Sequence, residues 1–324
     1  MDLPIFTISL DYELHWGVFD KRHRHSRLQI YDNTNALVPK LLDLFDQYGI
    51  GVTWATVGSL FLRNYEDWLH HAPLQKPEYH DQKYSAYRFV EENGIDDLTE
   101  KAHFASKMVK LIDEYPNQEL ATHTFAHYYC LERGQDIEAF DADLKAVQKV
   151  SQDVVGKKMS SLVFPRNQFN RKYLEICYQN GITAIRSNPD SWYWTGIGND
   201  DTTLSRKIFR TGDTFLPLGS KTYPLSAIKK VKGLPVAIPA SRLLRQFDPK
   251  LKQLNRLRLN RIKSEMTAAA QKKHCYHLWW HPENFGEHPV ECMAELEEIL
   301  QHYSGLKSKY GMKSWAMREY VTNI

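Results

Sequence analysis

Two histidines four residues apart, His123 and His127, are the residues whose spacing most directly suggests metal chemistry. Imidazoles at this spacing lie on one side of a helical turn, where both can bind one metal ion. A carboxylate from another segment would complete a three-ligand site with an open position for water. Position 124 is threonine, so the glutamate of the HExxH metalloprotease pattern is absent and a general base must come from elsewhere.

Asp11 and Glu13 are the candidates for the missing ligand and base. They follow a β-rich run at residues 5–10, and side chains two apart on an extended strand point the same way. One carboxylate could then bind the metal while the other accepts a proton. The alternative is a salt-bridged or helix-capping pair without a catalytic role.

Two further polar residues, Arg166 and His281, follow apolar runs at residues 162–164 and 275–279. An arginine at a strand end can hold a carboxylate bidentately and keep it ionised. A histidine fixed before Pro282 can serve as a general acid at the mouth of a barrel. An ordinary core or surface role is the alternative for each. All these groups lie at carboxyl ends of expected strands, where α/β barrels and doubly wound sheets place their active sites.

The elements that must position these residues alternate along the chain, which predicts an α/β fold with a parallel sheet. A single domain over residues 1–324 is expected, because neither an internal repeat nor a linker interrupts the pattern. Two segments, near 64–93 and 190–232, break the alternation and are expected to wall a substrate groove. Strands are expected at 5–10, 52–57, 119–122, 162–164, 182–185, 236–238 and 275–279, and helices at 36–48, 137–154, 173–179 and 292–303.

Composition indicates a globular protein: 42% of the residues are hydrophobic and 25% are charged. The net charge of +3 is too small to indicate a nucleic-acid partner. The sequence shows no signal peptide and no apolar run of membrane-spanning length. The four cysteines are scattered without a CxxC pair, which favours reduced thiols. We therefore predict a cytoplasmic protein.

A basic stretch at 242–263 contains eight lysines and arginines against one acid, Asp248. Leucines recur within it, so it could form a basic amphipathic helix that touches an anionic membrane surface or a substrate diphosphate. An outer helix with a solvated basic face is the alternative. The first insertion is rich in aromatic residues, which could stack on sugar rings or form a small satellite core: Tyr65, Trp68, Tyr79, Tyr84, Tyr87 and Phe89.

In order and strand placement, these motifs resemble the polysaccharide deacetylases with the NodB-homology fold, carbohydrate esterase family four. The resemblance spans residues 5–320 and rests on four segments, 9–13, 123–127, 164–167 and 278–281. It implies a single distorted, seven-stranded (β/α) barrel related to the TIM barrel. Two departures stand out: the first motif is Asp-x-Glu instead of two adjacent aspartates, and the arginine motif lacks the usual Arg-Pro-Pro-Tyr sequence.

The resemblance also implies roles for individual residues. A divalent ion, Zn²⁺ with Co²⁺ or Ni²⁺ as alternatives, would be held by Glu13, His123 and His127. Asp11 would act as base with Arg166 as its partner, and His281 would protonate the leaving amine. A backbone amide near Asn167 would bind the oxyanion. Substrate contacts are expected from Asn167, Trp280 and Asp190.

The activity so implied is hydrolysis of an N-acetyl or N-formyl group from an aminosugar. The sugar would belong to a polysaccharide or to its nucleotide- or lipid-linked precursor, during surface polysaccharide biosynthesis. Two alternatives remain open at this point. One is a non-sugar amide or imide hydrolase of the same fold, and the other is an inactive barrel that binds glycans.

Overall fold

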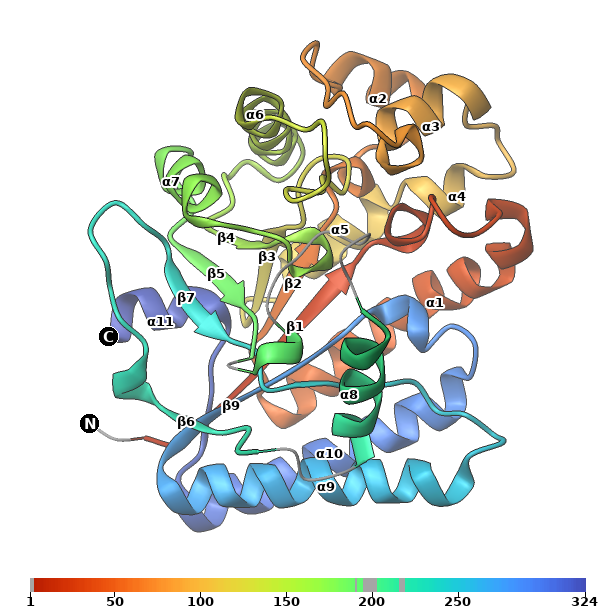
Figure 1. The fold of residues 1–324 in the computed structure, drawn as a ribbon. Coiled ribbons are helices and arrows are strands. Elements are labelled where there is room, and N and C mark those ends of the chain that lie inside the picture. The colour runs from red at the N-terminus through yellow and green to blue at the C-terminus, as the bar shows by residue number, and fades with distance from the viewer. Residues whose placement is uncertain (1–2, 190, 195–202, 216–218) are drawn as a thin grey trace.

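The computed structural model describes residues 3–189, 191–194, 203–215 and 219–324. Its centre is a parallel sheet in the order β9-β1-β2-β3-β4-β5-β7 (Figure 1). The strands are β1 (Ile5–Tyr12), β2 (Val52–Thr56), β3 (Gln118–Thr122), β4 (Ser161–Val163), β5 (Ala184–Ser187), β7 (Val236–Pro239) and β9 (His274–Trp280). The chain after β7 forms β8 (Arg242–Leu243), which pairs with β9, so the sheet curls round on itself. The structure confirms the distorted barrel.

Helices cover the outside of the sheet (Figure 1). The longer ones are α1 (Leu28–Tyr48), α5 (Ser106–Glu114), α6 (Ile137–Val155), α7 (Arg171–Gln179), α9 (Lys252–Lys272) and α10 (Pro289–Tyr310). The expected elements at 36–48, 137–154, 173–179 and 292–303 are therefore confirmed as helices. Helix α1 ends at Gly49, whose φ of 62° is the left-handed conformation that glycine adopts without steric cost.

The pleat of the strands separates two kinds of buried residue. In β1, Ile8 and Leu10 belong to the main hydrophobic core beneath the helices. The alternate residues Ser9 and Asp11 face the barrel interior, where both contact Arg186 of β5. Helix α11 (Met317–Asn323) contacts the amino-terminal part of the strands through the hydrogen bond between the hydroxyls of Tyr320 and Thr7, 2.8 Å long. Polar groups are thus held inside the barrel.

The first insertion forms the short helices α2 (Tyr65–His71) and α3 (Ala86–Asn93), which lie together at the upper right of Figure 1. Four of its aromatic side chains are buried in the hydrophobic core: Trp68, Tyr79, Tyr84 and Tyr87. These four residues are therefore part of the main core and form neither a separate satellite core nor a sugar-stacking surface. The second insertion contributes α8 (Leu204–Phe215) and the two-residue strand β6 (Tyr223–Pro224), which pairs with β9.

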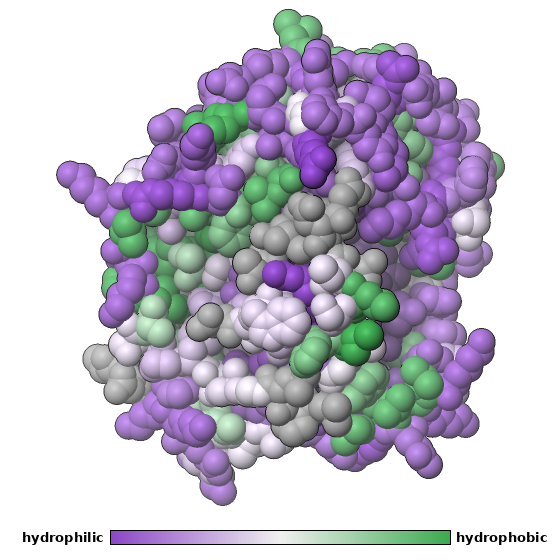
Figure 2. Space-filling model, in the orientation of Figure 1, coloured by the Kyte–Doolittle hydropathy of each residue, from purple (hydrophilic) through white to green (hydrophobic). Residues whose placement is uncertain are grey.

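Most cations of the basic stretch are neutralised by carboxylates on α9 and α10. Arg242 and Arg258 are buried and pair with Glu265 and Glu295. Arg256 and Lys263 both pair with Glu298. The stretch is therefore less positive in the folded protein than its sequence suggests. No helix among the described residues has the length and apolarity needed to cross a membrane. Hydrophilic residues dominate the face shown in Figure 2, with smaller hydrophobic groups between them.

Candidate active site

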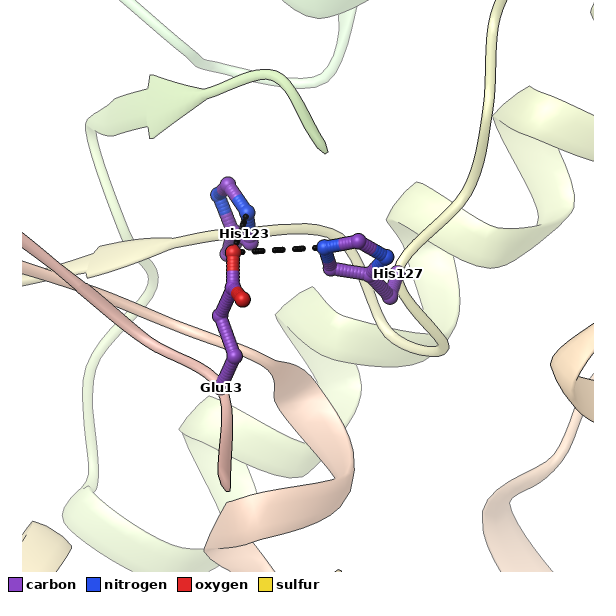
Figure 3. A group of neighbouring side chains, drawn as sticks. All are labelled: Glu13, His123 and His127. Carbon is purple, nitrogen blue, oxygen red and sulfur yellow. Dashed lines mark hydrogen bonds and ion pairs between the residues drawn. The ribbon is translucent and has the colours of Figure 1, made fainter. Parts of the chain in front are cut away.

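Glu13, His123 and His127 meet at the carboxyl ends of β1 and β3 (Figure 3). The Nε2 atoms of His123 and His127 lie 2.9 and 3.3 Å from the same Glu13 oxygen, Oε1. The ligand atoms of all three residues lie within 4.8 Å of one another. All three side chains are buried. The sequence-predicted metal ligands are therefore brought together.

The segment that carries the two histidines is a loop, so the expectation of a helical turn was wrong. Thr124 and His127 have φ values of 65° and 55°, which turn the chain back on itself. Asp143 of α6 holds this loop from behind. Its Oδ1 accepts a hydrogen bond from the Phe125 amide at 2.6 Å, and its Oδ2 accepts one from the Ala126 amide at 3.2 Å. The Tyr87 hydroxyl donates a third bond, 2.7 Å long.

The electrostatic states of Glu13 and His127 suit a divalent ion. Burial lowers the pKa of His127 to about 4, so its imidazole is neutral at neutral pH. Burial opposes ionisation of Glu13, but His281, His127 and His123 outweigh it and hold the pKa of Glu13 well below its usual range. Neutral imidazole and ionised carboxylate are the forms that bind metals. Gly17 leaves space for the carboxylate, because a Cβ there would overlap Glu13 Oε2.

Asp11 is held by Arg186, not by Arg166 as the sequence suggested. Two guanidinium nitrogens of Arg186 donate to the two Asp11 oxygens at 2.6 and 2.7 Å. Arg166 instead pairs with Asp20 at 2.6 Å and lies 4.1 Å from the Tyr129 ring centroid. Arg166 lies in a turn with a φ of 52°, whereas Arg186 is a residue of β5 on the face that points into the barrel. This difference in backbone position explains why Arg186, and not Arg166, pairs with Asp11.

His281 lies beside both carboxylates at the mouth of the barrel. Its Nε2 is 3.6 Å from Glu13 Oε1 and 3.8 Å from Asp11 Oδ2. Its side chain is 29% exposed, in contrast to the buried His123 and His127. His281 therefore lies beside both carboxylates and is also accessible to solvent, two properties that suit a proton donor.

Trp280 does not contact the site, so the expected substrate contact was wrong. Its ring is fully buried and stacks on Phe285 at 5.6 Å in the core beneath the helices. Trp279, one residue earlier, points to the opposite face of the pleat and lines the cavity. Its ring centroid lies 5.7 Å from that of His281. Because neighbouring side chains of a strand point to opposite faces, Trp279 lines the cavity and Trp280 lies in the core.

Asn167 lines the cavity and accepts a hydrogen bond from Arg186 through its side-chain oxygen, at 3.2 Å. The backbone amides of Asn167 and Gln168 donate within the turn, to Phe164 at 2.9 Å and Pro165 at 3.2 Å. These two amides are engaged in the turn, and the oxyanion contact expected near Asn167 stays a prediction. Asp190 lies outside the described residues.

Glu283 was not predicted from the sequence, yet it joins the ends of β1 and β9. Its Oε1 accepts hydrogen bonds from the backbone amides of Glu13, at 2.7 Å, and of Leu14. Burial and the nearby Glu13 carboxylate raise the pKa of Glu283 to about 8. Leu14 has a φ of 49°, so Glu283 stabilises a strained turn next to a candidate ligand.

These groups surround one cavity of about 390 Å³. Asp11, Glu13, His127 and His281 line it together with Trp279 and Asn167. An Arg-held carboxylate, a carboxylate–histidine cluster and a solvent-accessible histidine are the parts that water-dependent hydrolysis of an amide requires. The fold and the site together suit a barrel hydrolase.

The family model for polysaccharide deacetylases matches residues 20–185, just over half of the chain. The chain therefore belongs to the polysaccharide deacetylase family, and its general activity is that of a carbohydrate deacetylase. No curated protein sequence matches it significantly.

Solved structures share the fold at low sequence identity. A Mycobacterium smegmatis protein described as a polysaccharide deacetylase is 14% identical, with a TM-score of 0.61 over 99% of this chain and 89% of that one. A Pseudomonas aeruginosa PAO1 protein described in the same way is 11% identical, with a TM-score of 0.57 over 99% and 91%. An allantoinase is 9% identical, with a TM-score of 0.58 over 99% and 90%. Identities this low support the shared fold alone.

Proposed function

We propose that this protein hydrolyses the N-acetyl or N-formyl group of an aminosugar with the help of a divalent metal ion. The observation that carries the proposal is the convergence of Glu13, His123 and His127 beside an arginine-held Asp11 in one cavity. Family membership supplies the carbohydrate class of the substrate. The acyl group, the sugar and the role of each residue are parts of the proposal.

Glu13, His123 and His127 would hold the ion, for which Zn²⁺ suits two imidazoles and a carboxylate, with Co²⁺ or Ni²⁺ as alternatives. When bound, such an ion activates water and polarises the acyl oxygen. The donor set fits, because two Nε2 atoms already face one carboxylate oxygen.

Proton transfer is assigned to Asp11 and His281. Asp11 accepts the proton of the attacking water, and its two contacts with Arg186 fix its direction. His281 gives a proton to the leaving amine from the open side of the cavity. Its Nε2 lies 3.8 Å from Asp11 Oδ2, so the proposed acid and base act at the same end of the cavity. Asn167 and Trp279 contact the sugar.

We place the reaction in the cytoplasm, on a polysaccharide precursor, without a nucleic-acid partner. Four buried, free cysteines are in keeping with a reducing compartment. The single-domain organisation is likewise proposed, and so is peripheral contact of residues 242–263 with a membrane. Lys250 and Lys252 are exposed, and no salt bridge of either is recorded among the described residues, so they are the cations proposed for such contact.

Acid release from a substrate panel tests the proposal. Zn²⁺-loaded protein is incubated with N-acetyl and N-formyl aminosugars, free and linked to nucleotide or lipid, and with allantoin as a non-sugar imide. We expect acetate or formate with an equal amount of free amine from a sugar, and a loss of about 100-fold or more in Asp11→Asn. Asp32→Asn, at an exposed position, is the matched control.

Two results would contradict the proposal. Hydrolysis of allantoin with no reaction on any sugar would identify a non-sugar amidase. Tight sugar binding by the metal-loaded protein, with no acid released, would identify a glycan-binding barrel.

A further inference from the structure

Three arginines from three separate segments line the cavity that contains the metal-binding cluster. Arg27 comes from the turn before α1, Arg166 follows β4, and Arg210 lies on α8. These segments are far apart in sequence. The fold therefore gathers positive charge around a single opening.

Two of these arginines have no acidic partner. Within the described parts of the chain, no carboxylate lies within 4.0 Å of Arg27 or Arg210, whereas Arg166 pairs with Asp20. Arg210 donates to the backbone oxygen of Tyr193 at 2.6 Å and lies 5.1 Å from the Trp194 ring centroid. The buried Nε of Arg27 and the buried Nη1 of Arg166 have no hydrogen-bond partner among the described residues. These two unpaired donors belong to residues that line the cavity.

The carboxylates of the cavity interact with groups other than Arg27 and Arg210. Asp11 is held by Arg186, and Glu13 faces the two histidines. The Oε1 atom of Glu283 accepts from two backbone amides. Partly buried guanidinium groups without a counter-charge are energetically costly, so an anion from outside would stabilise them.

The position of the arginines relative to the reaction centre suggests what that anion is attached to. Two aromatic rings connect Arg210 to His281: Trp194 lies 6.4 Å from Trp279, and Trp279 lies 5.7 Å from His281. Aromatic faces suit the apolar face of a sugar ring. A sugar on these tryptophans would present its acyl group to the reacting centre and its other end to the cations.

We propose that Arg27, Arg166 and Arg210 form a cationic wall that binds a phosphoryl group linked to the N-acyl sugar. This inference rests on the proposed function, because it names the substrate class of the same site. Guanidinium groups form paired, charge-assisted hydrogen bonds with phosphate oxygens. Three guanidinium groups offer more donors than one planar carboxylate can accept, which favours a tetrahedral dianion with several free oxygens. The substrate is therefore a sugar phosphate or sugar diphosphate unit.

Equilibrium binding to N-acetylglucosamine 1-phosphate and to N-acetylglucosamine tests the proposal. The protein is stripped of metal, because phosphoryl oxygens also bind divalent ions. Binding is followed by calorimetry in wild type, in Arg27→Gln/Arg210→Gln and in the control Arg63→Gln/Arg171→Gln. The control arginines are exposed and pair only along their own helices or turns. Arg166 stays unchanged because its pair with Asp20 supports the fold.

We expect the wild type and the control to bind the phosphate at least tenfold more tightly than the neutral sugar. Loss of both arginines should weaken phosphate binding by about 100-fold, roughly tenfold for each charged hydrogen bond lost, and leave neutral-sugar binding unchanged. Equal phosphate binding in the arginine variant and the wild type would overturn the proposal. Tighter binding of N-acetylmuramic acid than of the phosphate would overturn the phosphoryl assignment in favour of a carboxylate.

Two further ligands separate the sources of the phosphoryl group. Tighter binding of uridine diphosphate N-acetylglucosamine supports a nucleotide-linked substrate, and tighter binding of a short-chain prenyl phosphate N-acetylglucosamine supports a lipid-linked one. Because this binding assay needs no turnover, its result for the cationic wall does not depend on whether the protein is a hydrolase. Arginine-dependent phosphate binding without acid release would overturn the hydrolase alone. Acid release from neutral and phosphorylated sugars at equal rates would overturn the cationic wall alone.

Discussion

Arg186 and Asp11 form a two-pronged ion pair inside the barrel, with nitrogen–oxygen distances of 2.6 and 2.7 Å. Arg186 also contacts Ser9 and Asn167, and its guanidinium carbon lies 4.1 Å from the Trp279 ring centroid. Both charged side chains are buried, so neither can rotate into water. The proposed base is therefore oriented by a residue of β5, a strand that β2, β3 and β4 separate from β1 in the sheet.

Arg186→Lys should reduce acid release by about tenfold to 100-fold while the bound metal stays at the wild-type level. A lysine keeps the charge but cannot form the two parallel hydrogen bonds that orient Asp11. The measurement is kcat on the substrate found in the panel, together with elemental analysis. Arg171→Lys is the control, since Arg171 is exposed on α7. Wild-type turnover in Arg186→Lys would show that Asp11 needs no such orientation.

Asp143→Asn should weaken metal binding by about tenfold to 100-fold, which is the usual effect of removing a group that orients metal ligands. The amide retains one acceptor oxygen and cannot accept from Phe125, Ala126 and Tyr87 together. Competition with a Zn²⁺ chelator measures the affinity. Asp141→Asn, at the surface of the same helix, should bind metal like the wild type. Unchanged affinity in Asp143→Asn would mean that the loop keeps its shape unaided.

His277 should make the fold sensitive to acid. Burial, together with the charge of Arg186, lowers the pKa of His277 to about 3, while an unfolded histidine has a pKa of about 6.5. Between pH 6.5 and pH 3, His277 binds a proton in the unfolded chain but stays neutral in the folded protein. Stability from this residue is therefore complete above pH 6.5 and is lost as the pH falls towards 3, by about 1.4 kcal/mol per pH unit.

Urea unfolding of metal-free protein at pH 7.5 and pH 5.0 measures this effect. The free energy of unfolding of His277→Gln should fall about 2 kcal/mol less between the two pH values than that of the wild type. Glutamine retains a group that can bond to Ser9, which His277 contacts at 2.9 Å. The exposed His70→Gln variant is the control. The same loss in wild type and His277→Gln would assign the acid sensitivity to other groups.

The fold was largely predictable because its signals are local. Runs such as residues 5–10 and 275–279 became β1 and β9, and the apolar period at 137–154 became α6. Polar residues after the strands then marked the active-site end, which placed Asp11, Glu13, His123 and His281 near one another. These predictions needed only the carboxyl end of each strand, because parallel strands bring those ends together at one side of the sheet.

Partner assignments were less predictable because they depend on side-chain direction. Arg166 and Arg186 both follow apolar strand residues, and only the turn at Arg166, with its φ of 52°, sends that side chain to Asp20. Trp279 and Trp280 are adjacent, so they point to opposite faces of β9, and two neighbouring tryptophans do not show which one faces the cavity. Glu283, two residues after His281, was not predicted, because its contacts with the Glu13 and Leu14 amides depend on the folded turn. Asp143 had one detectable signal, an acid on the apolar face of a helix.

The central claim is that Glu13, His123 and His127 hold one divalent ion. Elemental analysis of purified wild type, of His123→Ala/His127→Ala and of His25→Ala/His70→Ala tests it, after all three proteins are incubated with Zn²⁺ and desalted. The last variant removes two exposed histidines and controls for adventitious binding. We predict close to one Zn²⁺ per chain in the wild type and the control, and none in His123→Ala/His127→Ala. Metal-free wild type, even after incubation with Co²⁺ or Ni²⁺, or equal metal in all three proteins, would contradict the claim.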